Sequence, residues 1–393
     1  MTAGTEPSTA MRIVDADAHI LEPADLWTAR LPARVSGVAP RVERDPKTGV
    51  SHWRVGDRWI WPVGHWAQAG WRDYPPLNPL EFTDVQPAAY DPRERLHRMD
   101  EYGLSVQMIY PNIIGFQAPL FEELGPELAL TCTQVYNDFV LEWCSADRTR
   151  LIPVAMLPYW DRDATVREMG RCVSLGFRAV LFANKFEQIG LPGFSEPHWD
   201  PVYAAAQEMD LPINYHIGFA VDNSSLLDAD ALGEKRARGA AWRRNQALAS
   251  SAVSMNQCDV LGTLVTSGLC DRFPRLKLVN VETGFGQIPY YLELLDWNWR
   301  ASGNRSELLP SEYFRRQCYG TFWFERGTLP LLSLYPDNFM FSTDYPHPTS
   351  LSPGPCSPSL PPGEHVRQAF RRIDPVLAAK ALSGTAESLY KLG

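Results

Sequence analysis

The stretch Val14-Asp15-Ala16-Asp17-Ala18-His19 follows the apolar residue Ile13 and reads as a short buried strand that ends in polar side chains. Side chains two positions apart lie on the same face of a strand, so Asp17 and His19 point the same way. A carboxylate and a neutral imidazole are common ligands of Zn, Mn and Fe in sites that keep a position open for water or substrate. Alternatively, Asp15 and Asp17 cap the following turn and His19 is an ordinary polar core residue.

From Pro92 onward, strand patterns alternate with helical patterns. The apolar periodicity and the turn residues predict strands over 106–110, 151–156, 178–182, 212–216, 277–282, 318–322 and 338–342. The helices predicted between and after them cover 92–102, 126–144, 161–175, 200–209, 245–267, 288–299, 329–334, 364–372 and 375–392. This alternation is typical of parallel sheets, and about eight repeats favour an α/β fold of the (β/α)8 TIM barrel type over an open sheet. No Gly-x-Gly-x-x-Gly follows the first strand, which disfavours a dinucleotide site.

The segment from about residue 20 to 91 shows no convincing helical periodicity and is predicted to be an insertion after the first strand. Within it, residues 49–62 predict a β-hairpin, because Gly56-Asp57 separates two aromatic, β-prone runs. Residues 1–10 are small and polar and predict a disordered tail, so residues 11–393 are expected to form a single metal-dependent TIM-barrel domain.

Composition excludes several classes of function. The 393 residues are 45% hydrophobic and 21% charged, without an apolar run near the roughly 18 residues of a membrane span, which predicts a soluble protein with no membrane partner. A net charge of −9 and the lack of a dense basic stripe argue against nucleic acid as a partner. The seven cysteines include no Cys-x-x-Cys pair, which fits a reducing cytoplasm.

Polar, metal-capable residues stand at the ends of four predicted strands. They are Asp17 with His19, then His216, Glu282 and Asp344. In a barrel the carboxyl ends of all strands converge on one mouth, so these residues meet in space. Carboxylates and imidazoles gathered in a buried mouth are costly unless a cation or a hydrogen-bond network uses them. The convergence therefore favours a divalent-metal site over capping or core roles.

These motifs resemble a known family. Val14-Asp-Ala-Asp-Ala-His19, Ile213-Asn-Tyr-His-Ile-Gly218, Glu282-Thr-Gly-Phe-Gly-Gln-Ile-Pro289 and Ser342-Thr-Asp-Tyr-Pro-His347 together resemble the amidohydrolase superfamily. The resemblance is to the branch typified by aminocarboxymuconate semialdehyde decarboxylase and the resorcylate-type decarboxylases, and it spans the barrel from residue 12 onward. It implies one divalent metal, Zn or Mn, bound by Asp17, His19, His216 and Asp344. It also implies an enzyme that hydrolyses or non-oxidatively decarboxylates a small organic substrate.

The chain departs from the decarboxylase pattern in two ways. The decarboxylases typically place a catalytic His after strand six, where this chain has Glu282. Glu22 and Glu282 also add carboxylates that can hold a second metal. A small group of amidohydrolase-like proteins with a similar pattern uses dinuclear iron or iron/manganese for oxygenation, so an oxygenase remains an alternative. A metal-free binding or partner subunit is the second alternative.

Three residues are candidates for proton transfer. Asp344 can sit loosely on the metal and act as the general base, while Glu282 relays protons or orients a water. His347 is a candidate partner of these groups. For Glu282 a structural hydrogen bond to loop backbone, and for His347 a role in a Pro-flanked turn, remain the alternatives.

The substrate is expected to be a small, flat or apolar carboxylate. Arg54, Arg58 and Trp59 lie in the predicted insertion, and Arg matches carboxylate geometry bidentately. The insertion's other tryptophans are Trp53, Trp61, Trp66 and Trp71. These aromatics equally suit packing onto the barrel or a neighbouring subunit, and a homo-oligomer or a hetero-oligomer with a related chain is expected. His198 is a further pocket candidate, although a loop beside a helix cap is its simplest interpretation.

Overall fold

The computed structural model describes residues 11–71, 78–184, 186–218, 244, 247–248, 251–255, 257–355 and 357–393. The predicted disordered tail, residues 1–10, lies outside these residues. Part of the helix predicted over 245–267 also lies outside them, and its described part comprises a helical stretch at 251–255 and α9 (Cys258–Thr266).

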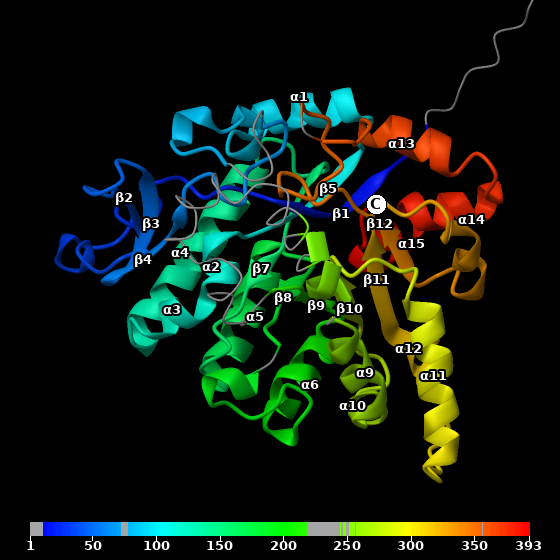
Figure 1. Ribbon diagram of the computed structural model, residues 1–393. Coiled ribbons are helices and arrows are strands. Elements are labelled where there is room, and N and C mark those ends of the chain that lie inside the picture. The colour runs from blue at the N-terminus through cyan, green and yellow to red at the C-terminus, as the bar shows by residue number, and fades with distance from the viewer. Residues whose placement is uncertain are drawn as a thin grey trace, which may run out of the picture.

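Short parallel strands lie in the centre of the molecule with helices around them (Figure 1). Two sheets contain them, in the orders β1-β5-β6 and β12-β11-β10-β9-β8-β7. The strands are β1 (Val14–His19), β5 (Val106–Tyr110), β6 (Leu151–Pro153), β7 (Ala155–Met156), β8 (Val180–Leu181), β9 (Ile213–His216), β10 (Leu278–Val281), β11 (Cys318–Phe322) and β12 (Phe339–Phe341). All of these strands are buried on nearly every residue, as expected when helices cover the outer face of a parallel sheet.

Two junctions close these sheets into one ring. At the first, β6 and β7 form a single strand interrupted at Val154, whose N–H donates to Ile109 O, while the next N–H, from Ala155, donates to Ala179 O. At the second, the chain after β12 pairs with β1, because the Asp344 N–H donates to Asp17 O at 2.9 Å and the His19 N–H donates to Tyr345 O. The described residues thus occupy eight strand positions, and the predicted (β/α)8 barrel is confirmed.

The helices between the strands follow ordinary start and stop signals. α1 (Pro92–Tyr102) begins after Asp91, whose side chain accepts two helix N–H groups, and ends at Gly103 with φ 70°. The other long helices of the barrel are α4 (Pro126–Cys144), α5 (Arg162–Leu175), α6 (Asp200–Glu208), α11 (Ile288–Ala301) and α12 (Pro310–Gln317). The shorter ones are α2 (Ile113–Phe116), α3 (Ala118–Glu122), α10 (Leu269–Arg272), α13 (Pro362–Ala369), α14 (Pro375–Ala379) and α15 (Thr385–Tyr390), and the segment predicted as a helix over 329–334 is a 3-10 helix.

The insertion after β1 carries a separate antiparallel sheet. The predicted hairpin is present as β3 (Ser51–Val55) and β4 (Arg58–Pro62), and β2 (Arg41–Arg44) adds a third strand that the sequence did not predict. This sheet lies at the edge of the molecule, beside α3 and α4 (Figure 1). Its position separates it from the ends of the barrel strands.

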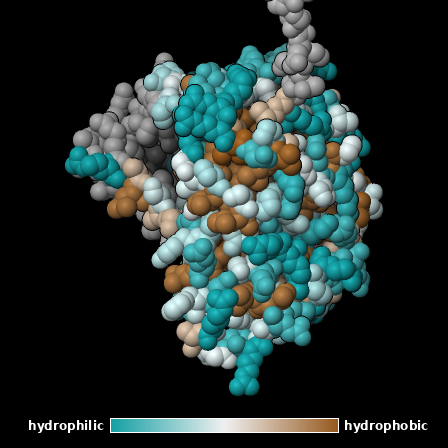
Figure 2. Space-filling view, turned by 90° about the vertical axis from the view of Figure 1, so that its right-hand side faces the viewer, coloured by the Kyte–Doolittle hydropathy of each residue, from teal (hydrophilic) through white to brown (hydrophobic). Residues whose placement is uncertain are grey.

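The outer surface is mixed in character. On the face turned toward the viewer in Figure 2, hydrophobic residues form several separate patches between hydrophilic ones. Among the described helices, none combines the length and the hydropathy needed to cross a bilayer.

Candidate metal centre

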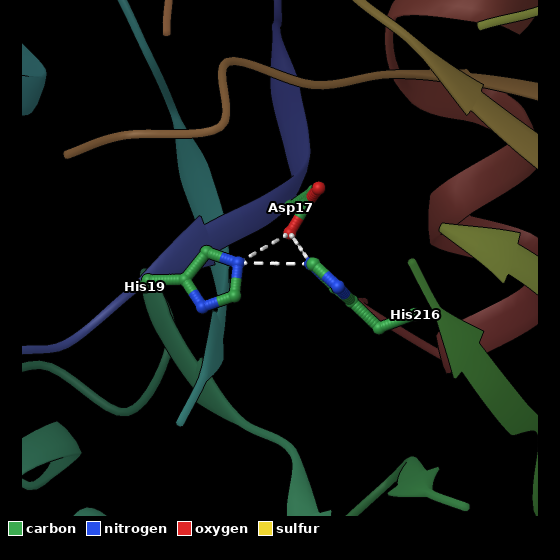
Figure 3. A group of neighbouring side chains, drawn as sticks. All are labelled: Asp17, His19 and His216. Carbon is green, nitrogen blue, oxygen red and sulfur yellow. Dashed lines mark hydrogen bonds and ion pairs between the residues drawn. The ribbon is translucent and has the colours of Figure 1, made fainter. Parts of the chain in front are cut away.

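Asp17, His19 and His216 converge at the carboxyl ends of β1 and β9, and all three are fully buried. The register of β1 against β5 shifts between Asp15 and Ala18, next to Asp17. Figure 3 shows the three side chains pointing at a common point. His19 Nε2 lies 2.9 Å from His216 Nε2, and Asp17 Oδ1 lies 3.3 Å and 3.4 Å from these two nitrogens.

Hydrogen bonds on the far side of each ring fix which nitrogen faces the centre. His19 Nδ1 lies 2.9 Å from Pro111 O, and His216 Nδ1 lies 2.8 Å from Ile217 O. A carbonyl oxygen only accepts, so each Nδ1 carries a proton, and the Nε2 of a neutral ring then presents a lone pair to the centre. Two such lone pairs and a carboxylate this close together require a positive charge between them. This donor set fits a divalent cation.

The carboxylate oxygens of Asp17 support the same interpretation. Neither Oδ1 nor Oδ2 accepts a hydrogen bond from any residue that the structure describes, although the side chain is fully buried. Buried carboxylates are normally hydrogen-bonded or bound to a cation, since desolvation of an unpaired charge costs several kcal/mol. Asp17 therefore has the environment of a ligand and not of a structural hydrogen-bond acceptor.

Two more carboxylates complete the centre from β10 and β12. Asp17, Glu282 and Asp344 bring one oxygen each to within 4.8 Å of one another, and Glu282 Oε2 lies 3.8 Å from His216 Nε2. Both added residues have left-handed backbones, with φ 59° at Glu282 and φ 58° at Asp344. This conformation costs of order 1 kcal/mol for a non-glycine residue and persists where the surroundings impose it, often at functional sites. The strained turns aim both carboxylates inward.

His347 lies beside the cluster. Its ring stacks on that of His19 with centroids 3.8 Å apart, and its Nδ1 lies 2.7 Å from Asp344 Oδ1. Its Nε2 lies 2.8 Å from Asn112 Oδ1. The other carboxylate oxygen of Asp344 accepts a hydrogen bond from Thr349 Oγ1 at 2.9 Å. His347 and Thr349 together orient Asp344.

The pKa values of Asp17 and the two histidines reflect burial and the attraction between the carboxylate and the rings. Burial raises the pKa of Asp17, but His216 and His19 outweigh it and hold that pKa below its usual range. Burial lowers the pKa of His19 to about 4. For His216, burial is outweighed by the Asp17 carboxylate, which raises the pKa above its usual value. A cation binds the unprotonated Nε2 atoms, so metal binding should weaken as the pH falls.

Burial shifts the pKa of each of the other groups of the centre toward its neutral form. Burial, followed by the neighbouring Asp344 and Asp17 carboxylates, raises the pKa of Glu282 well above its usual range. Burial and Asp17 likewise raise the pKa of Asp344 to about 7, and burial lowers that of His347 to about 3. A cation nearby would favour the ionised carboxylates, because opposite charge lowers their pKa.

Asp15 and Glu22 flank this centre but are engaged elsewhere. Asp15 accepts hydrogen bonds from Thr343 N, Thr343 Oγ1 and Gln107 Nε2, so neither it nor Asp17 merely caps a turn. Glu22 Oε1 accepts the backbone N–H groups of Asn112 and Ile113, both at 2.9 Å, and burial raises the pKa of Glu22 to about 7. Glu22 belongs to none of the described groups that can hold a metal ion, so its position does not support a second-metal role.

A cavity of about 650 Å³ reaches the centre at Glu282 and His347. Phe116 lines the cavity with its ring centroid 5.5 Å from that of His216, and the Trp66 ring stacks on Phe116 with centroids 5.0 Å apart. The remaining described lining is mostly apolar or hydroxyl-bearing: Ile217, Val253, Ser254, Met255, Thr283, Trp323, Phe324, Thr349, Ser350 and Leu351, with further serine, glycine and proline residues and Gln287. No lysine or arginine occurs among the described lining residues. Such a chamber suits a flat, largely apolar molecule.

Four predicted substrate residues do not line this cavity. Arg54 is engaged by Glu43 and Asp57 within the edge sheet. The Arg58 side chain is 65% exposed, and Trp59 is 42% exposed. His198 lies on the surface beside α6. The structure places these residues away from the cavity, with three of them in the sheet at the edge of the molecule, and their role in substrate binding stays a prediction.

Sequence reasoning missed Asn112, Thr349 and Phe116. All three lie in loops or short helices that follow strands, where the sequence shows no period that would mark them. The only available signal was position, since Asn112 follows the β5 strand end by two residues and Thr349 follows the β12 motif by two residues. Trp66, one of the insertion's tryptophans, does line the cavity.

Comparison with known proteins identifies the family. The sequence model described as "Amidohydrolase" matches residues 14–392, nearly the whole barrel. The chain belongs to the amidohydrolase family. This amidohydrolase is 28% identical over 292 residues to a gamma-resorcylate decarboxylase of Polaromonas sp. (strain JS666 / ATCC BAA-500), with 70% of this chain and 81% of the relative covered.

Solved structures agree on the fold. An amidohydrolase from Mycobacterium avium subsp. paratuberculosis K-10 superposes with a TM-score of 0.70 at 19% identity, covering 98% of this chain and 100% of the other. A dihydroxybenzoic acid decarboxylase from Polaromonas sp. JS666 gives a TM-score of 0.60 at 19% identity, with 97% of each chain covered. That structure contains bound manganese and the inhibitor 2-nitroresorcinol. Metal-capable groups of histidines and carboxylates are present in this chain too.

Proposed function

We propose that this amidohydrolase is a carboxy-lyase that removes the carboxylate of a small aromatic acid by non-oxidative decarboxylation. Asp17, His19, His216 and Asp344 would hold one divalent cation, with Mn²⁺ or Zn²⁺ as the candidates. The main support is the position of His19 Nε2 and His216 Nε2, which lie 2.9 Å apart. They lie beside the Asp17 carboxylate, which accepts no hydrogen bond from the described residues, near a cavity with aromatic walls. The gamma-resorcylate decarboxylase that covers most of the chain supports the reaction type.

The bound cation would supply Lewis acidity toward a carboxylate or phenol oxygen of the substrate. Phe116 and Trp66 provide flat walls for an aromatic ring, and the absence of Lys and Arg among the described lining residues leaves the substrate's negative charge to the metal centre. A small aromatic acid fits the volume of this cavity better than a large molecule does, and its mostly uncharged lining does not favour a multiply charged one.

Glu282 is the proposed proton donor. In decarboxylation the bond between the ring carbon and the carboxylate breaks, CO₂ leaves, and the electron pair left on the ring carbon takes up a proton. The Glu282 side chain is 15% exposed and lines the cavity, whereas Asp17 and His216 are fully covered. A carboxyl group at this position can give its proton to the ring carbon and regain one from solvent through the cavity. It would thus perform the role for which the related decarboxylases typically use a histidine.

The dinuclear oxygenase hypothesis finds no support in the relatives, which carry decarboxylase names. Hydrolysis uses the same cation and remains the competing reaction. The two differ in their product, because decarboxylation releases CO₂ whereas hydrolysis consumes water.

The test combines metal analysis with a substrate panel. Protein purified without chelator is analysed for Mn, Zn and Fe and then incubated with hydroxybenzoic and dihydroxybenzoic acids and with aromatic amides and esters. We expect about one Mn or Zn per chain, release of CO₂ from one or more of the acids, and a loss of turnover in Glu282→Gln that exceeds the loss of bound metal. Two iron ions per chain with oxygen consumption, or cleavage of amides alone, would contradict the proposal. A chain that binds no cation and gains no activity from added ions would point to a binding role.

A further inference from the structure

The loop that follows β5 contacts two of the site's histidines at once. The carbonyl oxygen of Pro111 accepts from His19 Nδ1 at 2.9 Å, and the side-chain oxygen of Asn112 lies 2.8 Å from His347 Nε2. Both loop residues lie outside the proposed metal ligands. The loop therefore contacts each histidine through one ring nitrogen, His19 Nδ1 and His347 Nε2, and leaves the other nitrogen of each ring to face the proposed ligands.

The orientation of the Asn112 amide is decided by its second contact. Its Nδ2 donates to Ile20 O at 3.0 Å, and a backbone carbonyl can only accept a hydrogen bond. The amide oxygen must therefore be the atom that faces His347. An amide oxygen is itself only an acceptor, so the Nε2 of His347 carries a proton in either charge state of the ring. The other ring nitrogen of His347, Nδ1, lies 2.7 Å from Asp344 Oδ1.

Glu22 holds this loop in place. Glu22 follows His19 by three residues, and its side chain is fully buried. Its Oε1 accepts hydrogen bonds from the backbone N–H groups of Asn112 and Ile113, both at 2.9 Å. Asn112 is fully buried as well. Without Glu22, the backbone N–H groups of Asn112 and Ile113 would lose their acceptor, and the loop would have to move to reach another.

We propose that Glu22 and Asn112 are positioning residues that keep the proton of His347 on Nε2 and direct its Nδ1 toward Asp344. The functional meaning of this positioning rests on the proposed metal centre. The contacts themselves are made between protein residues alone. It assigns Glu22 a role different from that of a ligand to a second metal. It also explains why a carboxylate that follows the metal-binding strand is turned away from the centre and toward backbone amides.

The first test reads the ring nitrogens directly. The chain contains eight histidines, so selective ¹⁵N labelling of histidine gives a spectrum in which His347 can be assigned by its loss in His347→Gln. In the full-length protein with Zn²⁺ added, we expect the His347 Nε2 signal in the range of a protonated nitrogen. In Asn112→Leu, which removes the acceptor at similar volume, this signal should move toward the unprotonated range. In Asn112→Asp, which retains an oxygen acceptor, it should stay. We expect Zn²⁺ affinity to fall by about 10–100-fold in the leucine variant, the usual effect of losing a group that orients ligands.

Asn338→Leu serves as the matched control. Asn338 is also a buried asparagine, but it lies just before β12, at the amino end of that strand. Its Nδ2 donates to the carbonyl oxygens of Phe314, Arg315 and Cys318. Its replacement should lower stability and leave the His347 signals unchanged. An unprotonated Nε2 in the unchanged protein, or an unaltered spectrum in Asn112→Leu, would overturn the proposal whether or not the enzyme proves to be a decarboxylase.

The second test separates the two roles of Glu22. Glu22→Gln keeps an oxygen that can accept both N–H groups but removes the negative charge that a metal ligand needs. A positioning role predicts the same number of metal ions per chain as in the unchanged protein and the same His347 spectrum. A loss of about one metal ion per chain in Glu22→Gln would instead make Glu22 a ligand and refute the assignment.

Discussion

Two buried carboxylates on β1, Asp15 and Asp17, differ in how they are satisfied. Both are fully covered and only two residues apart. Asp15 accepts hydrogen bonds from Thr343 and Gln107 at 2.5–2.8 Å, and the Asp17 N–H donates to it at 3.2 Å. Asp17 itself accepts none from the described residues. Burial alone therefore does not mark a functional carboxylate. What distinguishes the ligand is that the fold leaves its oxygens without donors.

The surroundings of Asp15 also contain a buried cation. Gln107, which donates to Asp15, accepts from Arg95 at 3.3 Å, and Arg95 further donates to the carbonyl oxygens of Ala88 and His19. The Arg95 guanidinium lies 4.6 Å from the centroid of the Tyr345 ring. The Asp15 network thus contains its own positive charge, whereas the Asp17 cluster must obtain one from a bound ion.

The largest effect should come from removing a nitrogen ligand of the Asp17 cluster. His216→Ala is expected to lose the bound metal and to lower kcat/KM by more than about 100-fold, because even groups that only orient ligands contribute 10–100-fold. The barrel should remain folded, as judged by circular dichroism. Metal content and turnover are measured together, and a variant that retains its metal would show that His216 is not a ligand.

Disrupting the other region should affect stability instead of metal binding. Asp15→Ala removes the acceptor of four donors and a buried carboxylate that interacts with Arg95, so we expect the free energy of unfolding to fall by about 3 kcal/mol. Denaturant titration measures this change, and the metal content of the surviving folded protein should be unchanged. Equal stability of Asp15→Ala and the unchanged chain would remove the distinction between the two carboxylates.

Added metal should stabilise only a chain with an intact Asp17 cluster. At a free Mn²⁺ or Zn²⁺ concentration about 100 times Kd, linkage predicts a gain of about 2.7 kcal/mol, visible as a rise in Tm. Asp17→Asn should lose most of this rise in Tm. With a chelator present, the same variant should be nearly as stable as the unchanged chain, because the Asp17 carboxylate accepts no hydrogen bond that the substitution would remove. The comparison is made by thermal unfolding with EDTA and with added metal. An identical rise in both chains would place the cation elsewhere.

The smallest effects are expected in the edge sheet. Arg58→Ala and Trp59→Ala replace exposed side chains outside the cavity, so stability should change by no more than about 0.5 kcal/mol and KM should not change. Steady-state kinetics on any substrate found for the enzyme provides the check. A rise in KM for either variant would bring the sheet back into substrate binding.

The positions of the proposed ligands could be predicted because they depend on regular structure. The alternation of β1 places Asp17 and His19 on one face, and the barrel topology brings His216, Glu282 and Asp344 to the same mouth. The family match agrees with the resemblance of these motifs.

Contacts made by irregular segments could not be predicted. Nothing periodic in the sequence indicates that Glu22 turns toward the amides of Asn112 and Ile113, or that the Arg54 side chain pairs with Glu43 in a sheet away from the mouth. The side of an insertion that faces the site depends on how its loops pack, which residue types alone do not determine.

The junction of the first and last barrel strands, β1 and β12, lies at the proposed metal centre, so metal binding should affect how firmly the barrel is closed. Two backbone hydrogen bonds join them, from the Asp344 N–H to Asp17 O and from the His19 N–H to Tyr345 O. Three of these four residues, Asp17, His19 and Asp344, are also the ones whose side chains are proposed to hold the cation. An ion bound there would link two chain positions more than 300 residues apart, and a link that closes so long a loop restricts the unfolded chain strongly. Loss of the ion would then open the barrel at its seam first, so hydrogen exchange should rise earliest along β1 and β12.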